Sequence, residues 1–374
     1  MGRTLPVVDL KGSPREWGLQ HGRAARRKVA SNVHSYLRRF TEWAKVPIEE
    51  VHRRADAYRQ GIEDASPAYA AAMAGIAEGS GQDLLDIVAV NVRYEMMYSE
   101  FANRGLARKA AGLAAVGGCT SFALLPEFTA NGHLLIGQNW DWIPEVEGLV
   151  VRATDEAGHT HLGFTEAGIA GTKIGLNDAG LGLVINGLVS NEDRWSSEGR
   201  PFHVRCWDVL AARTLAEAER SVTASNRTVS SNFLIAQTGA GVVDVEVAPG
   251  ARCRLEARDG YLAHANHFLD EKALGIWQPL AEDRPGTFTR YAFIQQRLAA
   301  WAAAGREVRV EDLKSLLRDH TNTPNSLCRH PDEAYVPDDR YETVVSAIMD
   351  LDAKELHVAA GTPCTTRYRR IALS

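Results

Sequence analysis

The chain has 374 residues, of which 45% are hydrophobic and 24% are charged, as is typical of a globular protein. Its formal net charge of −5 argues against a basic surface that binds nucleic acid. No apolar run reaches the ~18 residues that a membrane-spanning helix requires. The first residues lack the apolar stretch of a secretory signal, and the five cysteines are scattered without a Cys-x-x-Cys pair. We therefore expect a cytoplasmic protein with no nucleic-acid or membrane partner, no disulfide framework and no metal site.

Helical periodicity dominates the first part of the chain. Apolar residues recur every three or four positions over 29–43, which predicts one long helix. The Ser-Pro pair at 66–67 predicts the start of a second helix, which a glycine at 79 or 81 would end. Asp83 is placed to cap a third helix. Residues 104–118, RGLARKAAGLAAVGG, are rich in small side chains and indicate an exposed connector.

Short apolar runs broken by Gly, Asn, Asp or Pro predict strands from residue 119 onward. The Asn-Gly pair at 131–132 predicts a hairpin between the first two of these strands. Helices are predicted at 203–220, 287–303 and 310–318. Strands that alternate with pairs of helices suggest stacked sheets covered by helices. We expect a helical segment over 1–118 and a β-rich segment over 119–374.

Cys119 opens the first of these strands and directly follows Gly117 and Gly118. Glycines permit close approach, so the Cys119 sulfur could attack the carbonyl of Gly118 and move the acyl chain from nitrogen to sulfur. Hydrolysis of that thioester would free an α-amine with a pKa of ~7.7–8.0, a base on the same residue as its thiol. The alternative is a buried structural cysteine.

Several other motifs follow a fixed order around this cysteine. They are LKGSPREWGLQHG at 10–22, GIAEGSGQDLLDIVAVNVRYE at 75–95, GGCTSFA at 117–123, GQNWDW at 137–142, GLNDAGLGLVINGL at 175–188, HANHF at 264–268, SLCRHPD at 326–332 and GTPC at 361–364. As a set they resemble the acyl-coenzyme A:6-aminopenicillanic acid acyltransferase family (peptidase family C45), whose members are N-terminal-nucleophile (Ntn) hydrolases. The resemblance covers nearly the whole chain. It implies an α+β fold, a four-layer αββα sandwich with an N-terminal helical segment.

The resemblance also implies roles for the residues near Cys119. Cys119 corresponds to the family nucleophile, and the bond between Gly118 and Cys119 to the bond at which these proteins cut themselves. Asp141 ends the second strand of the predicted hairpin, from where it could hydrogen-bond the Cys119 amine. Asn139 shares a strand face with Asp141 and is a weaker candidate. For Asp141, a surface turn is the structural alternative.

Three further residues match family positions later in the chain. Asn266 corresponds to the asparagine whose amide donates to the oxyanion, and Asn186 to a position that lines the pocket. Arg329 corresponds to an arginine near the nucleophile, which could favour the thiolate or bind carboxylates. The structural alternatives are a turn for each asparagine and a salt bridge for Arg329.

The function implied is self-cleavage followed by acyl transfer. The cut would leave the fragments 1–118 and 119–374 as an αβ heterodimer, and an acyl-Cys119 thioester would pass its acyl group to water or to an amine. The substrate would be a small-molecule amide or acyl thioester. The chemistry needs no cofactor, although a coenzyme A thioester is a possible co-substrate.

Two alternatives remain open at this point. One is a papain-like thiol hydrolase that pairs Cys119 with a histidine, for which His264, His267, His320 and His330 are the candidates. The other is a non-catalytic binding protein on the same scaffold.

Overall fold

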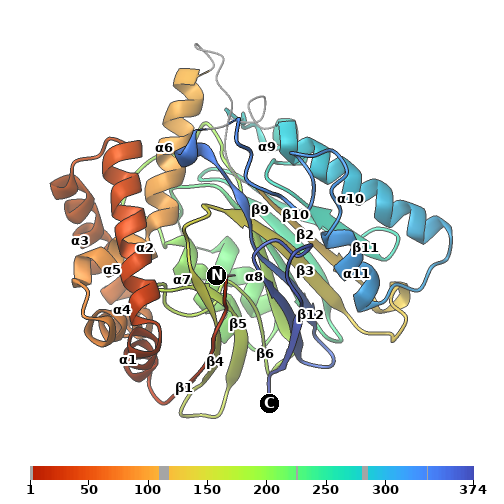
Figure 1. The fold of residues 1–374 in the computed structure, drawn as a ribbon, viewed down its shortest axis with the longest axis horizontal. Helices are drawn as coiled ribbons and strands as arrows, with labels where there is room; N and C mark the ends of the chain where they lie inside the picture. The colour runs from red at the N-terminus through yellow and green to blue at the C-terminus, as the bar shows by residue number, and fades with distance from the viewer. Residues whose placement is uncertain (1–2, 109–117, 225, 280–284, 335) are drawn as a thin grey trace.

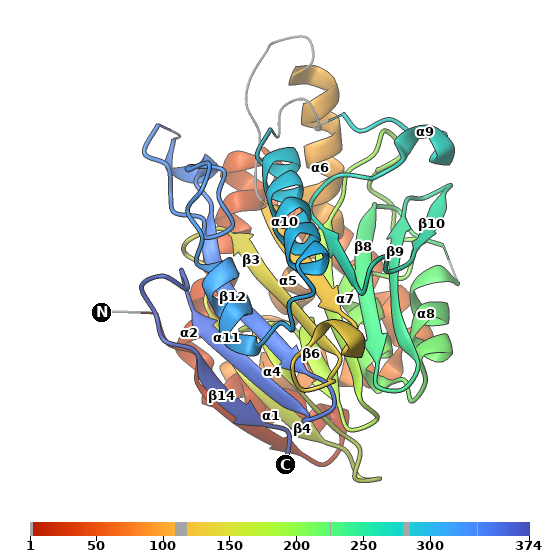
Figure 2. The same cartoon turned by 90° about the vertical axis from the view of Figure 1, so that its right-hand side faces the viewer.

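The computed structural model describes residues 3–374 except 109–117, 225, 280–284 and 335. Two sheets stack face to face, and helices cover the outer face of each sheet (Figures 1 and 2). This is the α+β, four-layer αββα arrangement that the sequence resemblance implied. None of the described helices is long and apolar enough to cross a membrane.

The larger sheet has eight strands. Their order is β1 (Val7–Lys11), β4 (Gly148–Thr154), β5 (Thr160–Glu166), β6 (Ile174–Asn177), β7 (Leu181–Gly187), β8 (Ser231–Gln237), β9 (Gly241–Val247) and β10 (Arg252–Leu255). β1 pairs parallel with β4, and the other pairs are antiparallel. The sequence did not predict β1, because four of its five residues are at least partly exposed and give no buried apolar run. The N-terminal segment therefore supplies an edge strand as well as helices.

The smaller sheet has six antiparallel strands. Their order is β11 (Tyr261–His264), β2 (Gly118–Leu124), β3 (Leu135–Trp142), β12 (Glu342–Asp350), β13 (Glu355–Ala360) and β14 (Arg369–Ala372). β2 and β3 pair as predicted, but a 3₁₀ turn at Pro126–Phe128 lengthens their connection beyond a two-residue hairpin. Every residue of both strands is buried, because this pair lies between the larger sheet and a helical layer.

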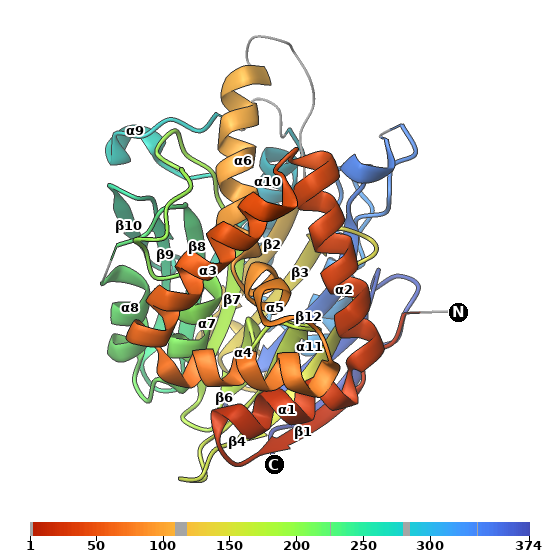
Figure 3. The ribbon, with the colours of Figure 1, turned by 90° about the vertical axis from the view of Figure 1, so that its left-hand side faces the viewer.

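Helices of the N-terminal segment cover the larger sheet on the side that Figure 3 faces. They are α1 (Pro14–Ala24), α2 (Arg26–Arg38), α3 (Ile48–Ala65), α4 (Pro67–Ser80), α5 (Leu84–Asn91) and α6 (Arg93–Arg108). α7 (Phe202–Ala211) and α8 (Leu215–Thr223) continue this layer, with the short α9 (Glu271–Leu274) at one end of the molecule. α10 (Pro285–Ala303) and α11 (Val310–Leu317) cover the smaller sheet.

Local signals explain where several of these helices begin and end. α4 starts at Pro67 and stops before Gly81, whose φ of 72° suits a residue without a Cβ. The Asp83 side chain caps α5 by accepting a hydrogen bond from the Leu85 N–H at 2.7 Å. Each of these two helices was predicted from the sequence.

Several predicted boundaries differ from the structure. The helix predicted over 29–43 is α-helical up to Arg38 and continues as a π-helix over Arg39–Trp43. The single helix predicted over 203–220 is divided into α7 and α8, because Thr214 and Glu217 form a capping box that starts a new helix. α6 runs to Arg108, so helix extends into the predicted connector. The rest of that connector, up to residue 117, lies outside the described residues.

Candidate active site

Cys119 lies in the interior of the molecule, where β2 faces the larger sheet. Its side chain is 5% exposed, and it pairs across the strands with Trp140, while Gly118 pairs with Asp141. Residues opposite each other in an antiparallel pair point to the same face, so the Cys119 thiol and the Trp140 ring both point between the two sheets. There they line a small cavity of about 20 Å³, with room for about one water molecule.

Asn266, in the loop after β11, holds the backbone of Cys119. Its Oδ1 accepts hydrogen bonds from the Cys119 N–H at 2.5 Å and from Arg290 Nη2 at 3.2 Å, and its Nδ2 donates to the Gly187 carbonyl at 3.0 Å. Two donors on one side and a carbonyl on the other determine which way the amide points. The Nδ2 group has two N–H donors, of which Gly187 takes one.

Arg290 was not singled out from the sequence, although it lies at the centre of this arrangement. Its Nη1 donates to the Cys119 carbonyl at 2.8 Å and to Thr120 Oγ1 at 2.9 Å. It packs so closely on the preceding residue that a Cβ on Gly118 would lie 1.9 Å from Nη2. The sequence pattern could have shown that Arg290 is buried, because it precedes Ile294 and Leu298 at four-residue spacing on the apolar face of α10.

Asp141 is buried on the other face of the same strand pair. Its Oδ1 accepts a hydrogen bond from Thr343 Oγ1 at 2.7 Å, and Oδ2 has no hydrogen-bond partner among the described residues. Burial raises the pKa of Asp141 to about 6, against the opposing charges of Arg290 and Arg329. In the intact chain, the Cys119 N–H donates to Asn266 and not to Asp141.

Arg329 lies beside Asp141. Its backbone N–H donates to Thr343 Oγ1 at 3.0 Å, so one threonine joins the Arg329 backbone to the Asp141 carboxylate. Its guanidinium carbon stands 6.0 Å from the centre of the Tyr341 ring. The positive charge of Arg329 therefore acts on Asp141, and it is not among the charges that shift the pKa of Cys119 most.

The two weaker asparagine candidates have structural partners. Asn139 points away from the thiol and donates from Nδ2 to the carbonyls of Leu317 and Leu327, both at 2.9 Å. Asn186 on β7 accepts a hydrogen bond from Ser121 Oγ at 2.6 Å. Ser121 is two residues after Cys119 on the same face of β2, and Asn186 is not among the described residues that line the cavity.

Charged side chains line the cavity opposite Cys119. Glu166 forms ion pairs with both Arg93 and Lys173, and all three side chains are buried. Burial alone would raise the pKa of Glu166, but these two cations hold it well below its ordinary value. Burial lowers the pKa of Lys173 to about 7, while Glu166 opposes this shift. Arg93 and Lys173 line the cavity, and Arg93 offsets the charge of Glu166, so this wall carries an additional positive charge when Lys173 is protonated.

The Cys119 thiol has a raised pKa in this setting. Burial raises it to about 11, and the nearby Asp141 charge contributes in the same direction. Arg290, a hydrogen bond from the Asp141 backbone and Lys173 all oppose the increase. The thiol is therefore protonated at neutral pH in this structure, and forming the thiolate would require a base.

The four histidines considered as partners of Cys119 are engaged elsewhere. His264 lies between Glu246 Oε1 and the Ala265 carbonyl, at 2.8 Å from each. His267 Nδ1 lies 2.9 Å from Thr287 Oγ1, and His320 and His330 contact each other. None of the four is among the described residues that line the Cys119 cavity.

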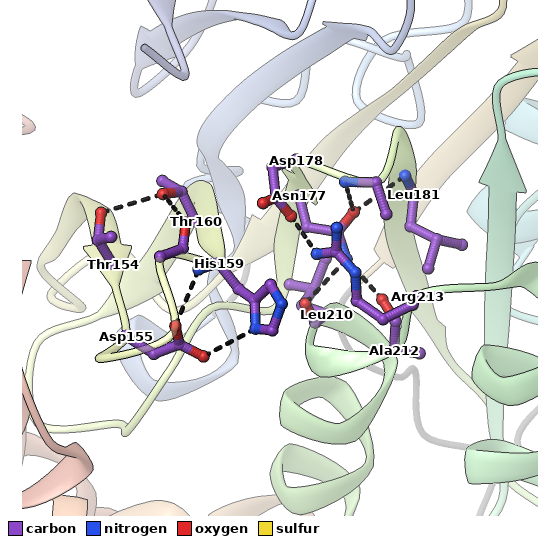
Figure 4. A network of polar contacts seen from close by, with 12 residues as sticks. Thr154, Asp155, His159, Thr160, Asn177, Asp178, Leu181, Leu210, Ala212 and Arg213 are labelled. Carbon is purple, nitrogen blue, oxygen red and sulfur yellow. Dashed lines mark hydrogen bonds and ion pairs between the residues drawn. The ribbon is translucent and has the colours of Figure 1, made fainter.

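A larger cavity of about 390 Å³ lies elsewhere in the molecule, and its lining residues are entirely different. Trp17, His161 and Trp207 form part of its wall. Figure 4 shows the polar groups near its rim, where Asp155 contacts His159 and Arg213 contacts Asp178. No cysteine lines this cavity among the described residues.

Comparison with known proteins identifies the family. The family model described as acyl-coenzyme A:6-aminopenicillanic acid acyl-transferase matches residues 128–364. The chain belongs to this acyltransferase family. The acyl-coenzyme A:6-aminopenicillanic-acid-acyltransferase 40 kDa form of Emericella nidulans is 27% identical over 365 residues, which cover 95% of this chain and 92% of that protein. The matched acyltransferase region contains Asp141, Asn266, Arg290 and Arg329, and it begins after Cys119.

The chain is also similar to solved structures of other proteins. A mutant of conjugated bile acid hydrolase from Clostridium perfringens has a TM-score of 0.46 and 14% identity, and the match covers 68% of this chain and 92% of that one. Penicillin V acylase from Agrobacterium tumefaciens has a TM-score of 0.44 and 18% identity, over 68% of this acyltransferase-family chain and 86% of its own.

Proposed function

We propose that this protein is an Ntn enzyme that cuts its own chain before Cys119 and then breaks or forms amide bonds through an acyl-Cys119 thioester. The observation that carries the proposal is the convergence of Asn266 and Arg290 on the peptide unit of Cys119. These residues come from separate segments and hold the backbone N–H and carbonyl on either side of the Cys119 Cα. The membership of an acyltransferase family supports the same chemistry.

In the self-cleavage step, the Cys119 sulfur attacks the carbonyl carbon of Gly118. The C–S bond forms as the C–N bond breaks, and the thiol proton passes to the departing nitrogen. Water then hydrolyses the thioester, which leaves a carboxylate on Gly118 and restores the thiol of Cys119, now with a free α-amine. The close packing of Arg290 on Gly118 supports this step, because it restricts the residue whose carbonyl is attacked.

In turnover, the new α-amine accepts the thiol proton and the sulfur attacks the acyl donor. Asn266 Oδ1, which accepts from the Cys119 N–H in the intact chain, would hold the α-amine. The second N–H of Asn266 Nδ2 is the donor available for the oxyanion. The thioester is then resolved by water or by an amine, so the protein acts as an N-acyl amidohydrolase or an N-acyltransferase, with a coenzyme A thioester as a possible acyl donor.

The two fragments would remain together as an αβ heterodimer. β1 pairs along its length with β4, and α1 to α5 pack on the larger sheet or on one another. These contacts do not depend on the bond that is cut. Since the cavity beside Cys119 holds about one water molecule in the intact chain, we expect cleavage to open it for a small-molecule substrate.

A papain-like mechanism is less well supported by the geometry, because none of the four candidate histidines lines the cavity of Cys119 among the described residues. A binding protein without catalysis would lack a reactive thiol. Labelling with a thiol-reactive acylating probe separates these functions: the Ntn enzyme is labelled at Cys119 only after cleavage, a papain-like enzyme as an intact chain, and a binding protein at neither stage.

The activity is tested by screening N-acyl amides and acyl thioesters for release or transfer of the acyl group. We expect Cys119→Ala to abolish both chain cleavage and turnover. Cys253→Ala is the matched control, because Cys253 lies on the edge strand β10 and should retain both. Turnover in Cys119→Ala equal to that of the unaltered protein would refute the proposal.

A further inference from the structure

Four potential metal ligands meet at a second place in the molecule. They are His320, Cys328, His330 and Cys364, and their ligand atoms all lie within 4.8 Å of one another. Cys328 is buried, His330 and Cys364 are half-buried and His320 is exposed, so the cluster lies just below the surface. No metal was expected here from the sequence, because the ligands come from separate segments and not from a Cys-x-x-Cys pair.

Hydrogen bonds that do not involve the four ligand side chains bring these segments together. The Cys328 N–H donates to the Asp319 carbonyl at 3.0 Å, which closes the loop and places His320 near Cys328. Arg318 Nε donates to the Pro363 carbonyl at 2.9 Å, which brings the segment of Cys364 alongside. The four side chains therefore converge on a place that the fold itself defines.

Three of the distances between ligand atoms lie close to those of a tetrahedral zinc site. With Zn–N and Zn–S bonds of about 2.1 and 2.3 Å, tetrahedral geometry separates two nitrogens by about 3.4 Å and a nitrogen from a sulfur by about 3.6 Å. The two histidine Nε2 atoms are 3.2 Å apart. His330 Nε2 is 3.2 Å from Cys364 Sγ and 3.8 Å from Cys328 Sγ.

Hydrogen bonding alone does not account for this arrangement. His330 Nε2 faces three polar atoms at once, and a ring nitrogen offers either one proton or one lone pair. A cation at the centre would satisfy all four ligand atoms together. Two imidazoles and two thiolates are also a common ligand set of structural zinc sites.

We propose that His320, Cys328, His330 and Cys364 bind one structural Zn²⁺ ion. Binding releases one proton from each thiol to solvent, and the two thiolates neutralise the charge of the metal. All four positions around the metal are taken by protein, which is the mark of a structural site and not of a catalytic one. The metal would tie the loop that carries Arg329 to the C-terminal segment before β14, and so fix the surroundings of Asp141.

The unaltered protein provides the first test. After expression with added zinc, elemental analysis of the purified chain should find one zinc per chain. Removing it with a chelator should lower the melting temperature, and zinc but not magnesium should restore it. Cobalt reconstitution should give the visible absorption of tetrahedral Co²⁺ and a thiolate-to-cobalt charge-transfer band. A chain that holds no zinc after loading, or holds it with octahedral cobalt spectra, would overturn the proposal.

Two variants assign the ligands. Cys364→Ser and His320→Ala should each lose most of the bound zinc, while the matched controls Cys253→Ser and His159→Ala, outside the cluster, should keep one zinc per chain. Unchanged zinc content in both ligand variants would contradict the assignment. So would a disulfide between Cys328 and Cys364 in protein purified under reducing conditions, since the thiolates would then be consumed.

Discussion

Gly118 and Arg290 illustrate how closely the peptide before Cys119 is held. The guanidinium occupies the space that a side chain at position 118 would need, and its hydrogen bonds fix the carbonyl of Cys119 and the side chain of Thr120. The requirement for glycine at the proposed cleavage bond is therefore a requirement for space. It does not depend on an unusual backbone angle.

Gly118→Ala should slow self-cleavage strongly. The added Cβ would lie 1.9 Å from Arg290 Nη2, so either the guanidinium or β2 must move, and the attacked carbonyl moves with it. The accumulation of uncut chain on a denaturing gel measures the effect. Gly61→Ala is the control, because its new Cβ would meet no atom closer than 3.8 Å. Equal cleavage rates in the two variants would show that the contact with Arg290 is unimportant.

Asn266→Ala should leave the fold intact and lower kcat/KM by roughly 10²–10³, the usual effect of removing one oxyanion donor. The variant also removes the acceptor of the Cys119 N–H, so slower cleavage is expected too. Steady-state kinetics on the cleaved fraction separate the two effects. Full turnover in that fraction would exclude Asn266 from the site.

At the scale of secondary structure, β5 and α6 are joined by a buried ion network. Glu166 at the end of β5 accepts a hydrogen bond from Arg93 Nε of α6 at 3.0 Å, and it also pairs with Lys173 just before β6. Tyr36 of α2 and Trp142 of β3 extend the network through hydrogen bonds. One carboxylate thus connects the N-terminal helices to strands of both sheets.

Glu166→Gln should destabilise the fold by about 3–5 kcal/mol, because it leaves the buried Arg93 guanidinium without its counter-charge. Chemical denaturation measures the change in the free energy of unfolding. Glu78→Gln breaks a salt bridge with Arg15 whose side chains are both more than half exposed, so it should cost less than ~1 kcal/mol. Similar losses in the two variants would contradict the role assigned to burial.

Most strands and helices could be predicted from the sequence, but their relative placement could not. Caps and apolar runs identified α4, α5, β2 and β3, because these signals are local. Pairing register is not local, and it turns the side chain of Asn139 away from the thiol. Motifs likewise located Cys119, Asp141 and Asn266, whereas Arg290 joins them only when α10 packs on the smaller sheet.

For the whole molecule, buried acids shape the dependence of stability on pH. Asp193 accepts hydrogen bonds from Ser190 and Ser230, yet burial raises its pKa from 3.8 to about 7. The folded state therefore holds this proton more tightly than the unfolded state does. Ionisation of Asp193 destabilises the fold progressively as the pH rises from about 4 to about 7.

Asp193→Asn should remove this contribution. Between about pH 4 and pH 7, the melting temperature of the variant should fall less, or rise more, than that of the unaltered protein, because the amide does not titrate. The comparison uses the change with pH, so any constant loss from altered hydrogen bonds cancels. Parallel pH curves for the two proteins would contradict a raised pKa at this site.

We infer that the active protein consists of two chains made by one cut in a fold that both halves share. N-terminal sequencing and intact mass of the catalytically active fraction show whether the cut is present. We expect two polypeptides that purify together, one of which begins with Cys119 and carries a free α-amine. An active fraction made only of uncut chain, with Gly118 still bonded to the nitrogen of Cys119, would contradict it.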